Sequence, residues 1–294
     1  MLVDTAQGLP SYIPILSSAL QSTASPTDPS QPDVSDIIIS HWHHDHVDGI
    51  PSVLILLKEL WDGRNTGKSY TPPRLHKYPV PEGSTGGHES SNNTLPTLLE
   101  GIPKDLYTPS SEGTVFHDLR NDQIFQDSLG TTLLRVLHTP GHTVDSIALH
   151  VPQDRALYTA DTVLGHGTAV FEDLGAYIES LNRMLNSQLT YETLYPAHGA
   201  IIPNGRETIS TYIKHRLERE AQIIEVIQAA PGKENFSTWD IVRTIYKSYP
   251  ENLWLPAARS VDLHLKKLKS DGRVKHVGGE GTEAKWKLVR APGL

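Results

Sequence analysis

The 294 residues suffice for one large domain or two modest ones, and a hydrophobic content of 37% is adequate for a core. The absence of cysteine excludes disulfides and thiolate metal ligands. The sequence shows neither an apolar run of about 18 residues nor a signal-peptide pattern. We therefore expect a cytoplasmic protein with no membrane partner.

The net charge of −8 is unevenly distributed. Residues 206–294 carry 16 Lys and Arg against 11 Asp and Glu, so residues 1–205 are strongly acidic. A solvated surface is the simplest explanation of the mild basic excess, with nucleic-acid binding as an alternative. We expect a catalytic domain over residues 1–205 and a second domain over residues 206–294.

Hydrophobic spacing predicts a helix over residues 12–20, a strand over 36–39 and a helix over 50–61. Residues 62–112 are rich in Gly, Pro, Ser and Asn and show no sustained periodicity. A loop of this length is usually functional or disordered, and we expect it to form one wall of a substrate cleft.

Short strands follow over residues 132–137, 146–151 and 156–158, and then a helix over 174–185. Together with the earlier elements, they fit an αββα sandwich, in which two sheets pack face to face between outer helices.

The last 90 residues or so show a different pattern. Helical spacing covers residues 207–229 and 256–268, and Ser237 is placed to cap a helix that runs to residue 246. Residues 273–277 and 284–289 resemble the strands of a hairpin. Three helices followed by a two-stranded hairpin predict a winged-helix-like domain.

The most informative motif is H-x-H-x-D-H, from His41 to His46, directly after the strand over 36–39. At a strand end, two imidazoles one residue apart can face one metal ion, while Asp45 and His46 face a second position nearby. A His-rich turn without function is the alternative for this segment alone.

Three later segments each place one His or Asp after a β-like run, at a turn with Gly or Pro or in the residues that follow the strand. They carry His142, Asp161 and His198. The candidate metal ligands are therefore His41, His43, Asp45, His46, His142, Asp161 and His198.

This ordered set resembles the metallo-β-lactamase superfamily, and Asp4 in Leu2-Val3-Asp4-Thr5 resembles the Asp of the family's first motif. The resemblance implies two Zn²⁺ per chain: His41, His43 and His142 hold one, while Asp45, His46 and His198 hold the other. Asp161 bridges the ions, and Asp4 supports the metal loop. Family members have further strands before the first motif, so we expect one edge of the first sheet to be missing, leaving backbone unpaired.

A resemblance to the β-lactamase-like-2 group lies in residues 165–173, 245–247, 250–253 and 263–268. This group includes RNA-cleaving enzymes and fungal thioesterases of the neosartoricin and atrochrysone type. The Pro-rich segment 70–77 resembles the fungal thioesterases. This resemblance implies release of an aromatic polyketide from the acyl carrier protein of a non-reducing polyketide synthase, or hydrolysis of a small thioester.

Under the thioesterase hypothesis, we expect Asp45 to hold zinc and orient the attacking water, and His166 to line the substrate cleft. The second hypothesis is a single-strand-specific endoribonuclease, in which Lys266, Lys267 and Lys269 would contact RNA phosphates. The third is a winged-helix binding protein with a vestigial hydrolase domain.

Overall fold

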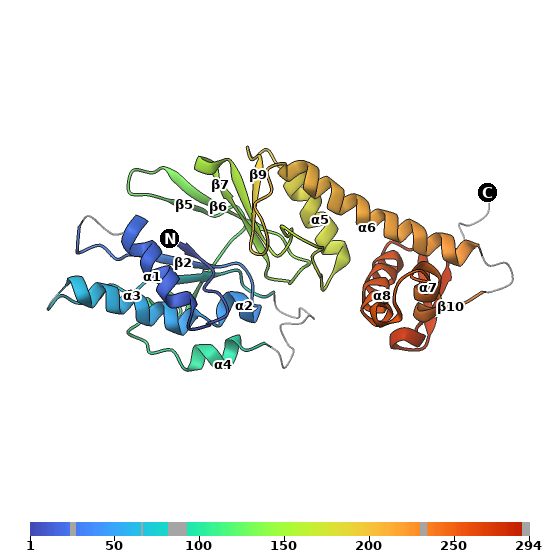
Figure 1. Cartoon of the computed structure of the whole chain (residues 1–294), viewed down its shortest axis with the longest axis horizontal. Coiled ribbons are helices and arrows are strands. Elements are labelled where there is room, and N and C mark those ends of the chain that lie inside the picture. The colour runs from blue at the N-terminus through green and yellow to red at the C-terminus, as the bar shows by residue number, and fades with distance from the viewer. Residues whose placement is uncertain (24–27, 66, 82–92, 230–233, 290–294) are drawn as a thin grey trace. The chain divides into compact units, whose positions relative to one another are not determined.

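The computed structural model describes residues 1–23, 28–65, 67–81, 93–229 and 234–289 (Figure 1). Packing divides the chain into two compact units, Met1–Ala169 with Leu189–Pro203 and Val170–Gln188 with Asn204–Leu294. The helix predicted over residues 174–185 therefore groups with the C-terminal unit, although the sequence boundary after residue 205 would place it in the first domain.

The first sheet consists, among the described residues, of four parallel strands in the order β1–β2–β3–β4. The strands are β1 (Leu2–Val3), β2 (Asp36–Ile39), β3 (Arg74–Lys77) and β4 (Phe116–Asp118). β1 forms one edge of this sheet. On β2, Ile37 and Ile39 belong to one apolar cluster and Ile38 to another, because successive side chains of a strand point to opposite faces.

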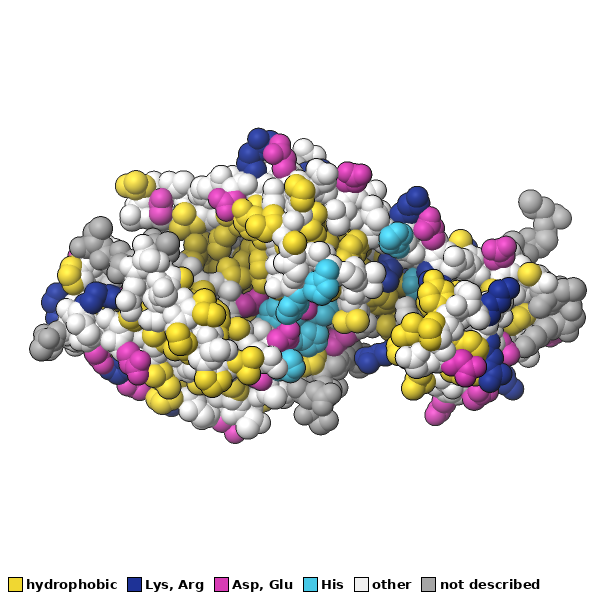
Figure 2. Space-filling view, viewed as in Figure 1, with side chains coloured by type: hydrophobic (Ala, Val, Ile, Leu, Met, Phe, Trp, Pro, Cys, Tyr) yellow, Lys and Arg dark blue, Asp and Glu magenta, His cyan; other side chains and the backbone are white. Residues whose placement is uncertain are grey.

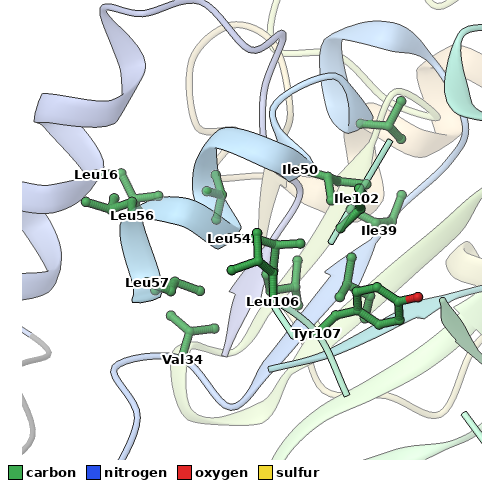
Figure 3. Close-up of a cluster of buried hydrophobic side chains, with 14 of the residues drawn as sticks. Leu16, Val34, Ile39, Ile50, Leu54, Leu56, Leu57, Ile102, Leu106 and Tyr107 are labelled. Atoms are coloured by element: carbon green, nitrogen blue, oxygen red, sulfur yellow. The ribbon is translucent and has the colours of Figure 1, made fainter. Parts of the chain in front are cut away.

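Helices of the first unit pack on the face of β2 that presents Ile37 and Ile39. The helices are α1 (Tyr12–Thr23), α2 (His44–Val47), α3 (Ile50–Arg64) and α4 (Leu95–Glu100). Figure 3 shows Leu16 of α1 and Ile50, Leu54 and Leu57 of α3 in this layer, with Tyr107 from the segment before β4. Their burial holds the start of α3 next to the predicted metal loop.

The second sheet packs on the other face of the first. Its strands are β5 (Ile124–Gln126), β6 (Thr132–His138), β7 (Ile147–Val151), β8 (Ala156–Ala160) and β9 (Thr193–Pro196), with the 3₁₀ helix η2 (Pro152–Asp154) before β8. Neighbours are antiparallel except β8 and β9, which are parallel. Ile38 packs with Val136, Ile147 and Leu149 between the two sheets. The result is the helix–sheet–sheet part of the predicted αββα sandwich, while the helix predicted over residues 174–185 for its second half groups with the C-terminal unit.

The prediction of an unbroken loop over residues 62–112 is wrong, because β3 and α4 lie within it. β3 reads Arg-Leu-His-Lys, and these polar side chains hide a buried strand from a search for apolar runs. The carboxylate of Asp36 on β2 explains why they are tolerated: it accepts hydrogen bonds of 2.8 Å from Arg74 Nε and 2.8 Å from His76 Nε2. Residues 82–92 of the predicted loop lie outside the described residues.

The C-terminal unit has the predicted winged-helix pattern. Its helices are α5 (Leu174–Leu185), α6 (Gly205–Gln228), α7 (Thr238–Ile245) and α8 (Trp254–Ser270), with 3₁₀ helices η3 (Glu251–Leu253) and η4 (Gly281–Glu283). Its strands are β10 (Phe236–Ser237), β11 (Val274–Gly278) and β12 (Lys285–Leu288). β11 and β12 form the expected hairpin, and β10 pairs with the far side of β12.

The capping role predicted for Ser237 is confirmed. Its hydroxyl accepts from the backbone N–H of Asp240, whose carboxylate accepts from the backbone N–H of Ser237. No described helix of either unit is long and apolar enough to cross a membrane.

His264 is a buried histidine in the apolar core of the C-terminal unit. It lies on α8, only 1% of its surface is exposed, and neither ring nitrogen has a hydrogen-bond partner in the described part of the chain. Burial, followed by the positive charges of Arg216, Arg219 and Lys267, lowers the pKa of His264 to about 3. The folded unit therefore holds this imidazole neutral.

This burial predicts acid sensitivity. Below pH 6.5 the unfolded chain binds a proton at His264 that the folded chain does not, so stability falls with pH. We expect about 1.6 kcal/mol to be lost from this residue between pH 6.5 and pH 5. Urea unfolding followed by tryptophan fluorescence at both pH values, compared with His264→Leu, measures the difference. Equal losses in the two chains would contradict the assignment.

Candidate metal centre

The candidate ligands lie at strand ends and in the turns that follow. β2 ends at Ile39, so His41 and His43 follow it directly, and α2 then carries Asp45 and His46. His142 follows β6, Asp161 follows β8 and His198 follows β9. Because both sheets end at the same side of this unit, residues far apart in sequence meet there. Figure 2 shows histidine and acidic side chains gathered at this surface.

Left-handed backbone accompanies each of the three later ligands. Gly141 (φ 129°) precedes His142, Ala160 (φ 46°) precedes Asp161, and Gly199 (φ 93°) follows His198. A Cβ on Gly199 would approach Gly165 Cα to 2.8 Å, so glycine is required there. The non-glycine Ala160 is strained, and such strain is typical of residues that a functional site holds in place.

The first ligand group consists of three imidazoles. His41 Nε2 lies 3.0 Å from His43 Nδ1, and His142 Nε2 lies 3.2 Å and 3.0 Å from the same two atoms. Three nitrogens bound tetrahedrally to one zinc at 2.0–2.1 Å would stand roughly 3.3 Å apart. The triangle therefore has the size that one such ion requires.

The second group combines two carboxylates with two imidazoles. His198 Nε2 lies 3.1 Å from Asp45 Oδ2 and 3.4 Å from Asp161 Oδ1, and His46 Nε2 lies 3.5 Å from the same Asp161 oxygen. The other oxygen of Asp161, Oδ2, lies 3.7 Å from His142 Nε2 in the first group. Asp161 thus presents one oxygen to each group.

The donors fit two metal ions. Each group places its ligand atoms within 4.8 Å of one another. His46 Nε2 and Asp161 Oδ1 are buried, and neither has a hydrogen-bond partner in the residues that the structure describes. Buried polar atoms normally have partners, so these two atoms indicate a cation site.

The electrostatics of the two groups differ. Burial, followed by the charge of His142, lowers the pKa of His43 to about 4, and burial lowers the pKa of His41 well below its usual value. Both rings are therefore neutral at pH 7 and offer lone pairs. Burial also opposes protonation of His46, but Asp161 and Asp4 outweigh it and raise its pKa to about 10. The second group therefore attracts positive charge, either a proton or a metal ion in its place.

Asp4 connects the ligand-bearing segments, as expected of it. Its Oδ2 lies 2.9 Å from His46 Nδ1, and its Oδ1 accepts a hydrogen bond of 2.7 Å from the backbone N–H of Ser40. The hydroxyls of Ser40 and Tyr158 also donate to Oδ2, at 2.8 Å and 2.6 Å. A histidine whose second nitrogen is held by a carboxylate is fixed in orientation and becomes a better metal ligand.

A buried ion pair braces the turn that carries His142. Lys77 at the end of β3 pairs with Asp145, which is fully buried, and Thr143 donates a hydrogen bond of 2.7 Å to Asp145 Oδ1. Removing one partner of such a pair leaves an uncompensated buried charge, so the pair resists displacement of the turn.

The remaining sequence expectations concern His44 and His166. The side chain of His44 is 53% exposed and belongs to neither group, as expected for a spacer. His166 is exposed and lies against Gly199, beside the turn of His198, without entering either group. The sequence did not reveal the roles of Ser40, Tyr158 and Lys77, because nothing in their local pattern points to partners distant in the chain.

Comparisons with known proteins agree with this site. The model of the "Metallo-beta-lactamase superfamily" matches residues 1–198, and that of the "Beta-lactamase associated winged helix domain" matches residues 237–286. The "Beta-lactamase-like protein 2 homolog" of Drosophila melanogaster is 33% identical over 94% of this chain and 80% of its own length. The "Atrochrysone carboxyl ACP thioesterase" of Aspergillus chevalieri is 28% identical over 86% of this chain and 66% of its own length.

Solved structures show the same fold. A β-lactamase domain protein from Burkholderia ambifaria superposes with a TM-score of 0.66 over 98% of this chain and 82% of its own, at 17% identity. The fold and the paired His/Asp groups define a hydrolase of the metallo-β-lactamase fold with a site suited to two metal ions. The chain belongs to the metallo-β-lactamase superfamily and carries the winged-helix domain associated with it.

The geometry predicts metal content. We expect about two equivalents of Zn²⁺ per folded chain, since two donor groups share one carboxylate. Asp161→Asn weakens the charge that both groups share and should lower the bound metal, whereas His44→Ala should keep it. Elemental analysis after dialysis provides the measurement. A folded wild-type chain without metal, or an Asp161→Asn chain with full metal content, would show the assignment to be wrong.

The hydrogen bonds to Asp4 predict that Tyr158, which contacts no metal-ligand atom, influences metal affinity. Tyr158→Phe removes one hydrogen bond to Asp4 and should weaken the second metal about 10-fold or more. Tyr195→Phe is the matched control, because Tyr195 pairs with Tyr158 across β8 and β9 but donates to Asp154. Competition with a chromophoric chelator measures both affinities. Equal affinities in the two variants would remove Tyr158 from the support of the site.

Proposed function

We propose that the chain is a dizinc thioesterase that releases an aromatic polyketide acid from the acyl carrier protein of a polyketide synthase. The observation that carries the proposal is the pair of ligand groups joined by Asp161, an arrangement suited to hydrolysis of an acyl bond. Similarity to a fungal carrier-protein thioesterase supports the choice of substrate.

The metal ions and the side chain of Asp45 have different roles in the proposed reaction. When bound, the two ions polarise the substrate carbonyl and lower the pKa of water from 15.7 to about 7. Asp45 Oδ2 lies within the second group, while Oδ1 lies 3.5 Å from the exposed His44 Nδ1. Asp45 therefore has one oxygen for a ligand position and a second that can accept a proton from the attacking water and fix its direction.

The leaving group decides between acyl substrates. A thiolate with a pKa near 8.5 departs without a strong proton donor, whereas an alkoxide or amide nitrogen needs one. At the site, burial is outweighed by contact with His46, which lowers the pKa of Asp161, so this carboxylate accepts protons at neutral pH and does not donate them. Hydrolysis of a thioester suits these groups.

The lysines of α8 support the endoribonuclease hypothesis less than the sequence suggested, because Lys266 and Lys267 form ion pairs within their own unit. Lys267 Nζ lies 3.0 Å from Glu220 Oε1 and 2.7 Å from Asp271 Oδ2, and Glu220 is buried. Lys266 is bound to Asp262 at 2.8 Å. Lys267 therefore compensates a buried carboxylate inside its own unit, and its replacement would test stability and not RNA binding.

The proposal predicts turnover of an aryl thioester and its loss on removal of Asp45. The metal-loaded chain should hydrolyse a 2-naphthoyl thioester of N-acetylcysteamine, and chelation should abolish the reaction. Asp45→Ala should lower kcat by at least about 10²-fold at saturating Zn²⁺, because it removes a ligand that also orients the nucleophile. His44→Ala, its sequence neighbour, should lose little. Thiol release followed with a thiol reagent gives the rates, and metal analysis accompanies each variant.

The same preparation tests the alternatives. Absence of thioester hydrolysis, combined with metal-dependent cleavage of single-stranded RNA that weakens in Lys266→Ala/Lys269→Ala, would favour the endoribonuclease. This double variant leaves Lys267 and its structural ion pair intact. Binding of RNA without cleavage of either substrate would favour the vestigial winged-helix protein.

A further inference from the structure

An apolar cavity of about 320 Å³ is lined in part by Trp42, the residue between the candidate ligands His41 and His43. Its walls come from β3 and the residues after it, from α4 and from β4, and they include Tyr78, Leu95, Leu99 and Phe116. Its size is at the low end of the roughly 300–1,000 Å³ that small-molecule pockets span. The cavity therefore fits a compact group and not a long chain.

Two of its wall residues connect it to the metal centre. Trp42 stands between His41 and His43 in the chain, and its ring meets that of His43 edge to face, with centroids 4.4 Å apart. Lys77 also lines the cavity, and its ammonium group pairs with Asp145 in the turn that carries His142. A group in the cavity is thus one side chain away from the first metal position, with Trp42 in contact with both the cavity and His43.

We infer that this cavity binds the aromatic acyl group of the thioester and directs its carbonyl toward the ligand groups. This inference rests on the proposed function and names the part of the substrate that determines specificity. Aromatic and aliphatic walls favour a planar apolar group, since removal of its surface from water is favourable and contacts between rings add to this.

The polar groups of the cavity argue against other occupants. The charge of Lys77 is compensated by Asp145, and Asp118 adds a carboxylate to the lining, so the cavity offers no excess positive charge to a phosphate. A pantetheine arm would bring two amides against Leu95, Leu99 and Phe116, whose side chains offer them no hydrogen bond, and unpaired amides cost free energy. The acyl end of the substrate is therefore the better occupant.

A substitution can fill the cavity without changing a metal-ligating residue. Leu99→Trp places an indole in the cavity, and Thr97→Trp places the same side chain on an exposed position of the same helix that does not line it. The metal-loaded chains are compared with acetyl and 2-naphthoyl thioesters of N-acetylcysteamine. Leu99→Trp should lower kcat/KM for the naphthoyl thioester at least about 10-fold and leave the acetyl thioester within about 2-fold. Thr97→Trp should change neither.

A binding measurement separates this inference from the proposed function. Calorimetric titration with neutral 2-naphthamide, which the enzyme need not hydrolyse, should show binding to the wild-type and Thr97→Trp chains and none to Leu99→Trp. Hydrolysis of both thioesters with equal effects of Leu99→Trp, or 2-naphthamide binding that survives Leu99→Trp, would overturn the cavity assignment and leave the thioesterase standing. Adenosine binding that Leu99→Trp abolishes, without 2-naphthamide binding, would overturn it in favour of a nucleobase. Failure of both thioesters would overturn the proposed function and the acyl identity of the occupant together.

Discussion

The carboxylate of Asp4 is the constraint on which the metal centre depends. It follows β1, receives the backbone N–H and hydroxyl of Ser40 after β2, orients His46 on α2 and is held by Tyr158 on β8. Both sheets of the first unit therefore meet at one buried carboxyl group. Its φ of 57° is unusual for a residue other than glycine, and the four contacts keep it in that strained conformation.

From this contact the ligands are arranged by charge. The imidazoles of His41 and His43 in the first group are neutral, whereas the carboxylates of Asp45 and Asp161 make the second group attract cations. Asp161 joins the two, so the positions are not independent and a change at one alters the other. The Lys77–Asp145 pair then fixes the turn of His142 and at the same time removes free positive charge from the neighbouring cavity. The same pair thus braces the metal site and sets the charge of the cavity that we infer to hold the acyl group.

Local patterns allowed the sequence to predict the ligands and several elements. The strand over residues 36–39 and the helix over 174–185 have the predicted bounds, because apolar runs and helical spacing are local properties. β3 escaped prediction because its polar side chains are compensated by Asp36 and Asp145, partners that lie elsewhere in the chain. The bond from Tyr158 to Asp4 spans 154 positions, a separation at which no spacing rule operates. The matching family models confirm the predicted family, whereas the substrate is proposed from the chemistry of the site.

Asp161 presents one oxygen to each ligand group, an arrangement in which it would join two metal positions in one hydrolytic site. Anomalous diffraction at the zinc edge from crystals of the metal-loaded chain would locate the ions. We expect two peaks about 3.5–4 Å apart. One should lie among His41, His43 and His142, and the other among Asp45, His46 and His198, with one Asp161 oxygen facing each. A single peak, or two peaks that do not flank Asp161, would contradict this arrangement.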